Sequence, residues 1–267
     1  MRLGLYVRSM GPQSAPDTVV RCARAVEENG LAHLWVGDHI AIPPDDAEGS
    51  DGRYLDPLAM LGFLAGCTSR VELGVGVLVL PYRPPLPTAK VVATVQELSG
   101  GRLLLGVGVG WMRPEFRAVG VDYRRRGRIT DATLELLERC FAGDVVEENG
   151  QPFLFRPRPP RPPILVGGAP EHAFRRVLRF GDGWMPFAME PGDLAPRVDE
   201  LRRRAAEAGK PAPRVVAVTR LELSDRSAAR ERASAFAAAG ATDLVHGWRY
   251  KGYDDFRVAA DALAALD

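Results

Sequence analysis

The chain is organised around one stretch, Leu103-Leu104-Leu105-Gly106-Val107-Gly108-Val109-Gly110-Trp111. It begins as an apolar strand and then carries glycine at every second residue. Because side chains alternate between the two faces of a strand, Gly106, Gly108 and Gly110 would share one face. Each glycine weakens a strand. The spacing therefore indicates a close approach to the backbone, either by a helix packed tightly on the strand or by a flat or phosphorylated ligand at the strand's end.

This glycine pattern does not match a dinucleotide-binding motif. That motif needs glycine where this chain has Trp111, and it needs a helix that opens within the motif. A Rossmann domain is therefore not expected.

Short apolar runs alternate with helical patterns on both sides of the stretch. Strands are expected at 3–7, 34–36, 71–80, 103–111, 164–168, 183–185, 215–221 and 243–245. Helices are expected at 17–29, 57–67, 87–98, 114–119, 129–141, 170–180, 194–208, 227–239 and 254–266. The strands are mostly continuous apolar runs, as in sheets covered on both faces. Eight strand–helix units in 267 residues predict an α/β fold, a single (β/α)8 barrel of the TIM type spanning residues 1–267.

A small insertion at about 142–162 separates the helix after the fourth strand from the fifth strand. It contains an expected short strand at 153–155 and the proline-rich run 156–163. Such a run can be a ligand for another protein module. Because it leads directly into the strand at 164–168, we interpret it as a stiff connector.

The composition excludes several classes of partner. Lys and Arg number 35 against 34 Asp and Glu, so neither nucleic acid nor a membrane surface is expected as a partner. No run of 18 apolar residues predicts a membrane span. The three cysteines, Cys22, Cys67 and Cys140, are far apart and odd in number, which favours a reducing compartment over a disulfide framework. Residues 1–7 are too strand-like for a signal peptide, so a cytoplasmic protein is expected.

In a barrel of this type the loops after the strand C-termini form the working face. Strand ends alone place there Asp38, His39, Gly76, Val77, Gly110, Trp111, Gly167 and Gly168. By the same argument, candidate lining residues of a substrate pocket are Tyr6, Arg8, Trp184, His246 and Trp248. No HExxH, CxxC or GxSxG motif is present, so neither a metal site nor a serine nucleophile is expected. With so few acid–base groups, the site is expected to take its reactivity from an organic cofactor.

Two of these motifs have alternative interpretations. Asp38 and His39 could be a structural cap with a satisfied histidine, but an imidazole at this rim can also exchange a proton with a substrate or cofactor. Both are therefore the candidate catalytic residues. The turn Gly167-Gly168-Ala169-Pro170 enters a helix, where free N–H groups and the helix dipole suit a phosphate. A plain tight turn is the alternative.

Several motifs occur together in a specific order and spacing. They are Gly37-Asp38-His39, Leu73-Gly74-Val75-Gly76-Val77-Leu78, Gly106 to Trp111 with Glu115-Phe116 and Gly120, Arg124 with Arg128 and Asp131, Pro163 to Gly168, and Gly181-Asp182-Gly183-Trp184. With these motifs, nearly the whole chain resembles the bacterial-luciferase-like monooxygenase superfamily. Within it, the chain resembles the oxidoreductases that depend on the deazaflavin coenzyme F420.

The resemblance implies a barrel that holds a flavin-type ring at the strand C-termini. It implies a cis peptide or bulge at Gly76–Val77 behind the ring, and it places Asp38 and His39 beside ring and substrate. The ribityl chain and phosphate would be held by Gly108, Val109, Gly110, Trp111, Gly167, Gly168 and Ala169. The arginines from Arg124 onward could meet an acidic cofactor tail, although a solvated helix start is the favoured interpretation. The family is often dimeric, so a homodimer is an expectation.

The chain also departs from the family pattern. Relatives that oxidise sugar phosphates carry a glutamate where this chain has Trp111, which argues against that activity. The long insertion that follows the seventh strand in many relatives is missing, so a small lid and an open pocket are expected.

The predicted function is hydride transfer between coenzyme F420 and a small-molecule organic substrate, with His39 donating to the substrate heteroatom. One alternative is an FMN-dependent monooxygenase on the same barrel. Another is a flavin- or deazaflavin-binding barrel without turnover. A metal-free aldolase or hydrolase would need a lysine or an acid pair at the rim, and neither Lys90 nor Lys210 is expected there.

Overall fold

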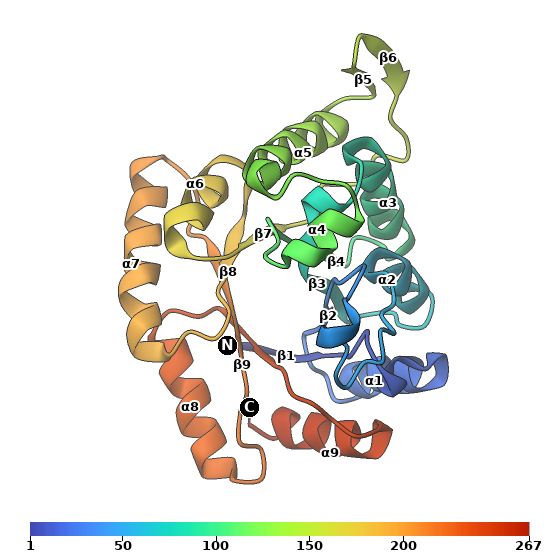
Figure 1. The fold of residues 1–267 in the computed structure, drawn as a ribbon. Helices are drawn as coiled ribbons and strands as arrows, with labels where there is room; N and C mark the ends of the chain where they lie inside the picture. The colour runs from blue at the N-terminus through green and yellow to red at the C-terminus, as the bar shows by residue number, and fades with distance from the viewer. Residues whose placement is uncertain (267) are drawn as a thin grey trace.

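In the computed structural model, which describes residues 1–266, eight parallel strands close into a barrel surrounded by helices (Figure 1). The order around the barrel is β1-β10-β9-β8-β7-β4-β3-β2. The barrel strands are β1 (Arg2–Tyr6), β2 (His33–Val36), β3 (Glu72–Val79), β4 (Leu103–Gly108), β7 (Ile164–Gly167), β8 (Gly183–Met185), β9 (Arg214–Thr219) and β10 (Asp243–His246). The predicted (β/α)8 barrel is therefore confirmed.

The helices follow the strands as the sequence predicts. They are α1 (Pro16–Glu28), α2 (Pro57–Ala65), α3 (Pro85–Leu98), α4 (Arg113–Ala118), α5 (Arg126–Ala142), α6 (Pro170–Phe180), α7 (Pro191–Glu207), α8 (Arg226–Ala238) and α9 (Tyr253–Ala264). Five of them begin with proline, which suits the first turn because its fixed φ is helical and its missing N–H has no partner there.

The insertion before β7 forms a hairpin. Strands β5 (Val145–Glu148) and β6 (Gln151–Leu154) pair in antiparallel fashion and project beyond α5 (Figure 1). The predicted strand at 153–155 is the end of β6, whereas β5 was not predicted. The sequence pattern that could have indicated β5 is Asn149-Gly150, a typical two-residue hairpin turn. Both residues have the positive φ that such a turn requires, at 52° and 74°.

A polar cluster fills the amino-terminal end of the barrel. His33 Nε2 donates to Asp243 at 3.1 Å, and Trp35 Nε1 donates to His33 Nδ1 at 2.8 Å. Arg214 donates twice to the same carboxylate, at 2.8 and 2.6 Å. A Cβ at Gly4 would lie 1.9 Å from the His33 ring, so glycine is required there. Because a buried charge is costly unless it is paired, these mutual hydrogen bonds allow charged side chains to fill this end of the barrel.

The glycines of β4 lie opposite alternate residues of the neighbouring strand β3. The peptide Gly76–Val77 is cis, and the register between β3 and β4 shifts between Val75 and Leu78, as the resemblance implied. A Cβ at Gly106 would lie 2.1 Å from the Val75 carbonyl oxygen, and one at Gly108 would lie 2.5 Å from Val77.

Gly110 lies just beyond β4, with φ 77°, and its Cβ would lie 2.6 Å from Val79. Both expected partners are compatible with the structure, since a Cβ at Gly110 would also lie 3.0 Å from Phe116 of α4, and Gly108 and Gly110 line the opening at the strand's end. The nearest approach, however, comes from alternate residues of β3, a strand that was not among the expected partners.

Candidate active site

A cavity of about 500 Å³ opens at the carboxyl end of the barrel. Its lining residues are Tyr6, Gly37, Asp38, His39, Gly76, Val77, Val79, Gly108, Val109, Gly110, Trp111, Gly167, Gly168 and Phe187. The structure thus brings together all the residues expected to bind the cofactor except Ala169. That residue lines an adjoining groove of about 640 Å³ beside α6 and α7, and Phe187 borders both spaces.

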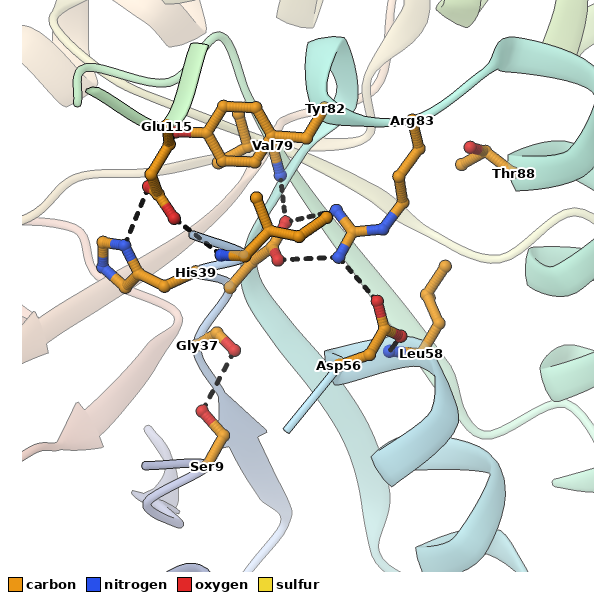
Figure 2. A network of polar contacts seen from close by, with 12 residues as sticks. Ser9, Gly37, His39, Asp56, Leu58, Val79, Tyr82, Arg83, Thr88 and Glu115 are labelled. Atoms are coloured by element: carbon orange, nitrogen blue, oxygen red, sulfur yellow. Dashed lines mark hydrogen bonds and ion pairs between the residues drawn. The ribbon is translucent and has the colours of Figure 1, made fainter. Parts of the chain in front are cut away.

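His39 is tied to a carboxylate that strand ends alone did not indicate. Its Nδ1 lies 3.0 Å from Oε2 of Glu115 in α4, as Figure 2 shows. The other oxygen of Glu115 accepts from the backbone N–H groups of Ile40 and Ala41, at 2.6 and 3.0 Å. Tyr82 donates its hydroxyl to Oε2 at 2.9 Å.

The Glu115 carboxylate is charged at neutral pH. Burial by itself would raise its pKa, but the hydrogen bonds from His39, the loop backbone and Tyr82 outweigh burial and lower the pKa to about 2. The His39 side chain is 28% exposed, so the ring reaches from a buried anion to the cavity.

Asp38 serves the structure. Arg83 binds both of its oxygens, at 2.7 and 2.8 Å, and the backbone N–H of Val79 donates to Oδ2 at 2.8 Å. Arg83 continues to Asp56, which caps α2 (Figure 2). The Asp38 side chain has 0% exposure, and its carboxylate holds the end of β3 through Val79 although the residue borders the cavity. These contacts favour the structural alternative for Asp38.

Tyr6 and Val77 form the floor of the cavity. The Tyr6 hydroxyl donates to the carbonyl oxygen of Gly76, and burial raises its pKa, so it stays protonated. A Cβ at Gly167 would lie 2.8 Å from Val77. Gly168, with φ 112°, has no neighbour within 4 Å of its Cβ position, so its backbone borders open space.

Four residues expected in the substrate pocket do not line this cavity. Trp184 is fully buried against Phe174 of α6 and donates its Nε1 proton to Gly168. His246 is buried and accepts from the N–H of Leu221, and Trp248 stacks on Phe256 of α9. Arg8 Nη2 lies 3.4 Å from the carbonyl oxygen of Gly49, and Arg8 is not among the lining residues.

The arginines at the start of α5 also lie outside the cavity. Arg124, Arg125 and Arg128 are exposed, which agrees with a solvated helix start. Asp131 pairs with Arg175 and Arg176 of α6 at 2.6 Å each.

Two features are absent from residues 1–266. No group of three or more His, Cys, Asp or Glu side chains could hold a metal ion. No helix is long and apolar enough to span a membrane.

The fold and the cavity define a TIM-barrel protein whose site is built at the carboxyl ends of its strands. The particular family is shown by a model for the luciferase-like monooxygenases, which matches residues 3–265. The chain belongs to this family.

Relatives with curated sequences include one of unknown function and one dehydrogenase. An uncharacterised protein of Mycobacterium tuberculosis is 32% identical over 218 residues, which cover 75% of each chain. The F420-dependent hydroxymycolic acid dehydrogenase of the same organism is 28% identical over 190 residues, 68% of this chain and 52% of that protein.

Solved structures with the same fold carry different cofactors. An F420-dependent secondary alcohol dehydrogenase bound to an F420–acetone adduct has a TM-score of 0.79 at 15% identity, covering 100% of this chain and 99% of the other. The oxygenating component of 3,6-diketocamphane monooxygenase from Pseudomonas putida, in complex with FMN, also has a TM-score of 0.79, at 13% identity, covering 99% and 98%. These likenesses establish the fold alone.

Proposed function

We propose that the protein transfers a hydride between coenzyme F420 and a small, neutral organic substrate. The observation that carries the proposal is which polar side chains of the cavity already have hydrogen-bond partners within the protein. Asp38 is paired, and the Tyr6 hydroxyl is engaged by a backbone carbonyl. His39 is therefore the acid–base group that the lining offers to a ligand. One proton-handling group without a nucleophile or metal suits chemistry in which the cofactor carries the electrons.

The cavity fits a flat heteroaromatic ring. Six of its fourteen lining residues are glycines, and three valines supply an apolar surface. Val77 would support the ring from below, and Gly108 to Trp111 would border its edge. Gly168 leaves open space towards the groove at Ala169, where a ribityl phosphate would leave the ring. When bound, F420 supplies a ring carbon that accepts or donates a hydride.

The residues also favour a neutral substrate. The only acidic or basic side chains of the lining are Asp38, which is paired, and His39. Trp111 and Phe187 are 69% and 43% exposed, so apolar surface borders the opening. A phosphorylated sugar would lose its hydration there without gaining a cation. Secondary alcohols and ketones satisfy these requirements, and the solved dehydrogenase with its acetone adduct acts on this class.

His39 would exchange the substrate proton. In alcohol oxidation it accepts the hydroxyl proton while the hydride leaves the carbon, and in ketone reduction it returns that proton. Placing the imidazole beside the reacting oxygen contributes about 10²- to 10⁴-fold to the rate in such reactions.

A binding titration with F420 and with FMN, followed by fluorescence, tests the proposal. We expect saturation by F420 and reduction of the bound coenzyme by a secondary alcohol. His39→Ala should keep the binding and lose turnover about 10²-fold or more. Saturation by FMN alone, with oxygen consumption, would establish the monooxygenase alternative and overturn the proposal. F420 that binds but exchanges no hydride with alcohols or ketones would also overturn it, in favour of a barrel without turnover.

A further inference from the structure

We propose that Glu115 is a positioning residue that fixes His39 as the neutral tautomer protonated at Nδ1, leaving Nε2 as a proton acceptor towards the cavity. The catalytic use of this tautomer rests on the proposed function. Its geometric basis is independent of the cofactor.

The first argument is the hydrogen-bond inventory of Glu115. Its carboxylate is 1% exposed and receives four donors, namely two backbone N–H groups, the Tyr82 hydroxyl and His39 Nδ1. An ionised carboxylate can only accept. The 3.0 Å contact with His39 is therefore a hydrogen bond only if Nδ1 carries the proton. In a neutral imidazole the other nitrogen is then unprotonated.

The second argument is the placement of the ring. Within residues 1–266 no protein group makes a hydrogen bond to His39 Nε2, and the residue lines the cavity. The rings of Tyr54 and Trp111 pack edge-on against the imidazole, with centroids at 5.2 and 6.3 Å. Glu115 and these two aromatic rings thus surround the imidazole, so its free nitrogen has a defined direction.

The two carboxylate oxygens of Glu115 have different partners. Oε1 holds the loop through Ile40 and Ala41, which is a structural function that an amide oxygen can also perform. Oε2 meets the imidazole and Tyr82, where the negative charge matters. Loop anchoring alone does not explain why an ionised group is buried beside the ring.

The arrangement has a direct chemical consequence in alcohol oxidation. With F420 bound as the hydride acceptor, the O–H proton of the alcohol would move to Nε2 while the C–H electron pair left as hydride and the C=O bond formed. His39 would then be an imidazolium beside the Glu115 carboxylate. The fixed anion stabilises the charge that develops on the ring.

Glu115→Gln separates positioning from loop anchoring. The amide oxygen can still accept from Ile40 and Ala41. Its NH2 group can only donate, so the favoured partner becomes an unprotonated Nδ1, and the tautomer of His39 reverses. Tyr82→Phe is the matched control, because it removes one donor from the same carboxylate and keeps the negative charge.

Nitrogen-15 NMR of histidine-labelled full-length protein without cofactor measures the tautomer. In the wild type we expect a protonated Nδ1 and a bare Nε2 for His39, assigned by the signals lost in His39→Gln. Glu115→Gln should show the reversed pattern, and Tyr82→Phe should keep the wild-type pattern. With F420 and alcohol, Glu115→Gln should lower kcat on the order of 10²-fold at nearly unchanged KM.

A wild-type His39 protonated at Nε2 would overturn the assignment, and this spectrum needs no variant to fold. A reversed tautomer in Glu115→Gln without loss of kcat would also overturn it. Because the spectra are recorded without cofactor, failure of F420 to bind would count against the proposed function while leaving the tautomer assignment standing.

Discussion

The side chain of Val77 lies in the space that a side chain at Gly108 would occupy. A Cβ at Gly108 would be 2.5 Å from Val77 Cγ2, and a Cβ at Gly167 would be 2.8 Å from Val77 Cγ1. Val77 therefore lies between β4 and β7, directly under the cavity. The glycines of the two strands set the height of the cavity floor by leaving room for a residue of β3.

Gly108→Ala should raise this floor. The added methyl group would push Val77 into the cavity, which should weaken cofactor binding and lower the free energy of unfolding by about 1–3 kcal/mol. Urea unfolding and the fluorescence titration measure the two effects. The control is a double-mutant cycle with Val77→Ala, which removes the overlapping methyl groups. The double variant should be more stable than the sum of the single changes predicts, and strict additivity would contradict the overlap.

Gly106→Ala should be more damaging than Gly108→Ala. Its Cβ would lie 2.1 Å from the carbonyl oxygen of Val75, which belongs to the backbone of β3 and cannot rotate away. Relief requires β3 and β4 to separate, so the urea midpoint should fall further than in Gly108→Ala. Val77→Ala should not rescue this variant. An equal or smaller loss of stability than in Gly108→Ala would show that the two strands can move apart at little cost.

The sequence predicted the barrel because each strand is a continuous apolar run and each helix has clear limits. It predicted a close approach at the glycines of β4 but not the approaching partner. That partner depends on the register of β3, where a shift between Val75 and Leu78 brings alternate valines against the glycines. A register between two strands is a tertiary property, so periodicity within one strand does not reveal it.

The lack of tertiary information in a single strand also explains why some predicted pocket residues do not line the cavity. A strand end predicts that a residue is near the rim, but the face depends on the phase of the alternation. In β8, Met185 points into the barrel, so its neighbour Trp184 points to the helices. In β10, Val245 points inward and His246 outward. Glu115 was visible only as part of a family motif, because its partner His39 is 76 residues away.

Arg83→Leu should strongly destabilise the protein. It would leave the carboxylate of Asp38, which has 0% exposure, buried without a cation, and breaking such a buried pair costs about 3–5 kcal/mol. The matched control is Asp56→Asn, which removes the second partner of Arg83. Asp56 is 44% exposed and asparagine caps a helix equally well, so this change should cost less than about 1 kcal/mol. Similar losses in urea unfolding would refute the assignment of Asp38 to the structure.

His246 should make the protein lose stability in mild acid. Its side chain is buried at the end of β10, and Nδ1 accepts from the backbone N–H of Leu221 at 2.9 Å. Burial, with a smaller contribution from Arg220, lowers its pKa from 6.5 to about 4. The unfolded chain therefore takes up a proton at a higher pH than the folded protein. The stability from the neutral ring is complete above pH 6.5 and is lost as the pH falls towards 4, by roughly 3 kcal/mol at about 1.4 kcal/mol per pKa unit.

His246→Asn isolates this contribution, because the amide oxygen can accept from Leu221 and does not titrate. Its free energy of unfolding should fall less between pH 7 and pH 4 than that of the wild type, as urea titrations at several pH values would measure. His172→Asn, a change at the exposed histidine of α6, should keep the wild-type pH dependence. Buried His33, whose pKa is also lowered by burial, leaves some acid sensitivity in every variant. If His246→Asn kept the full wild-type slope, the acid sensitivity would have to come from His33 and the carboxylates, and His246 would not be its source.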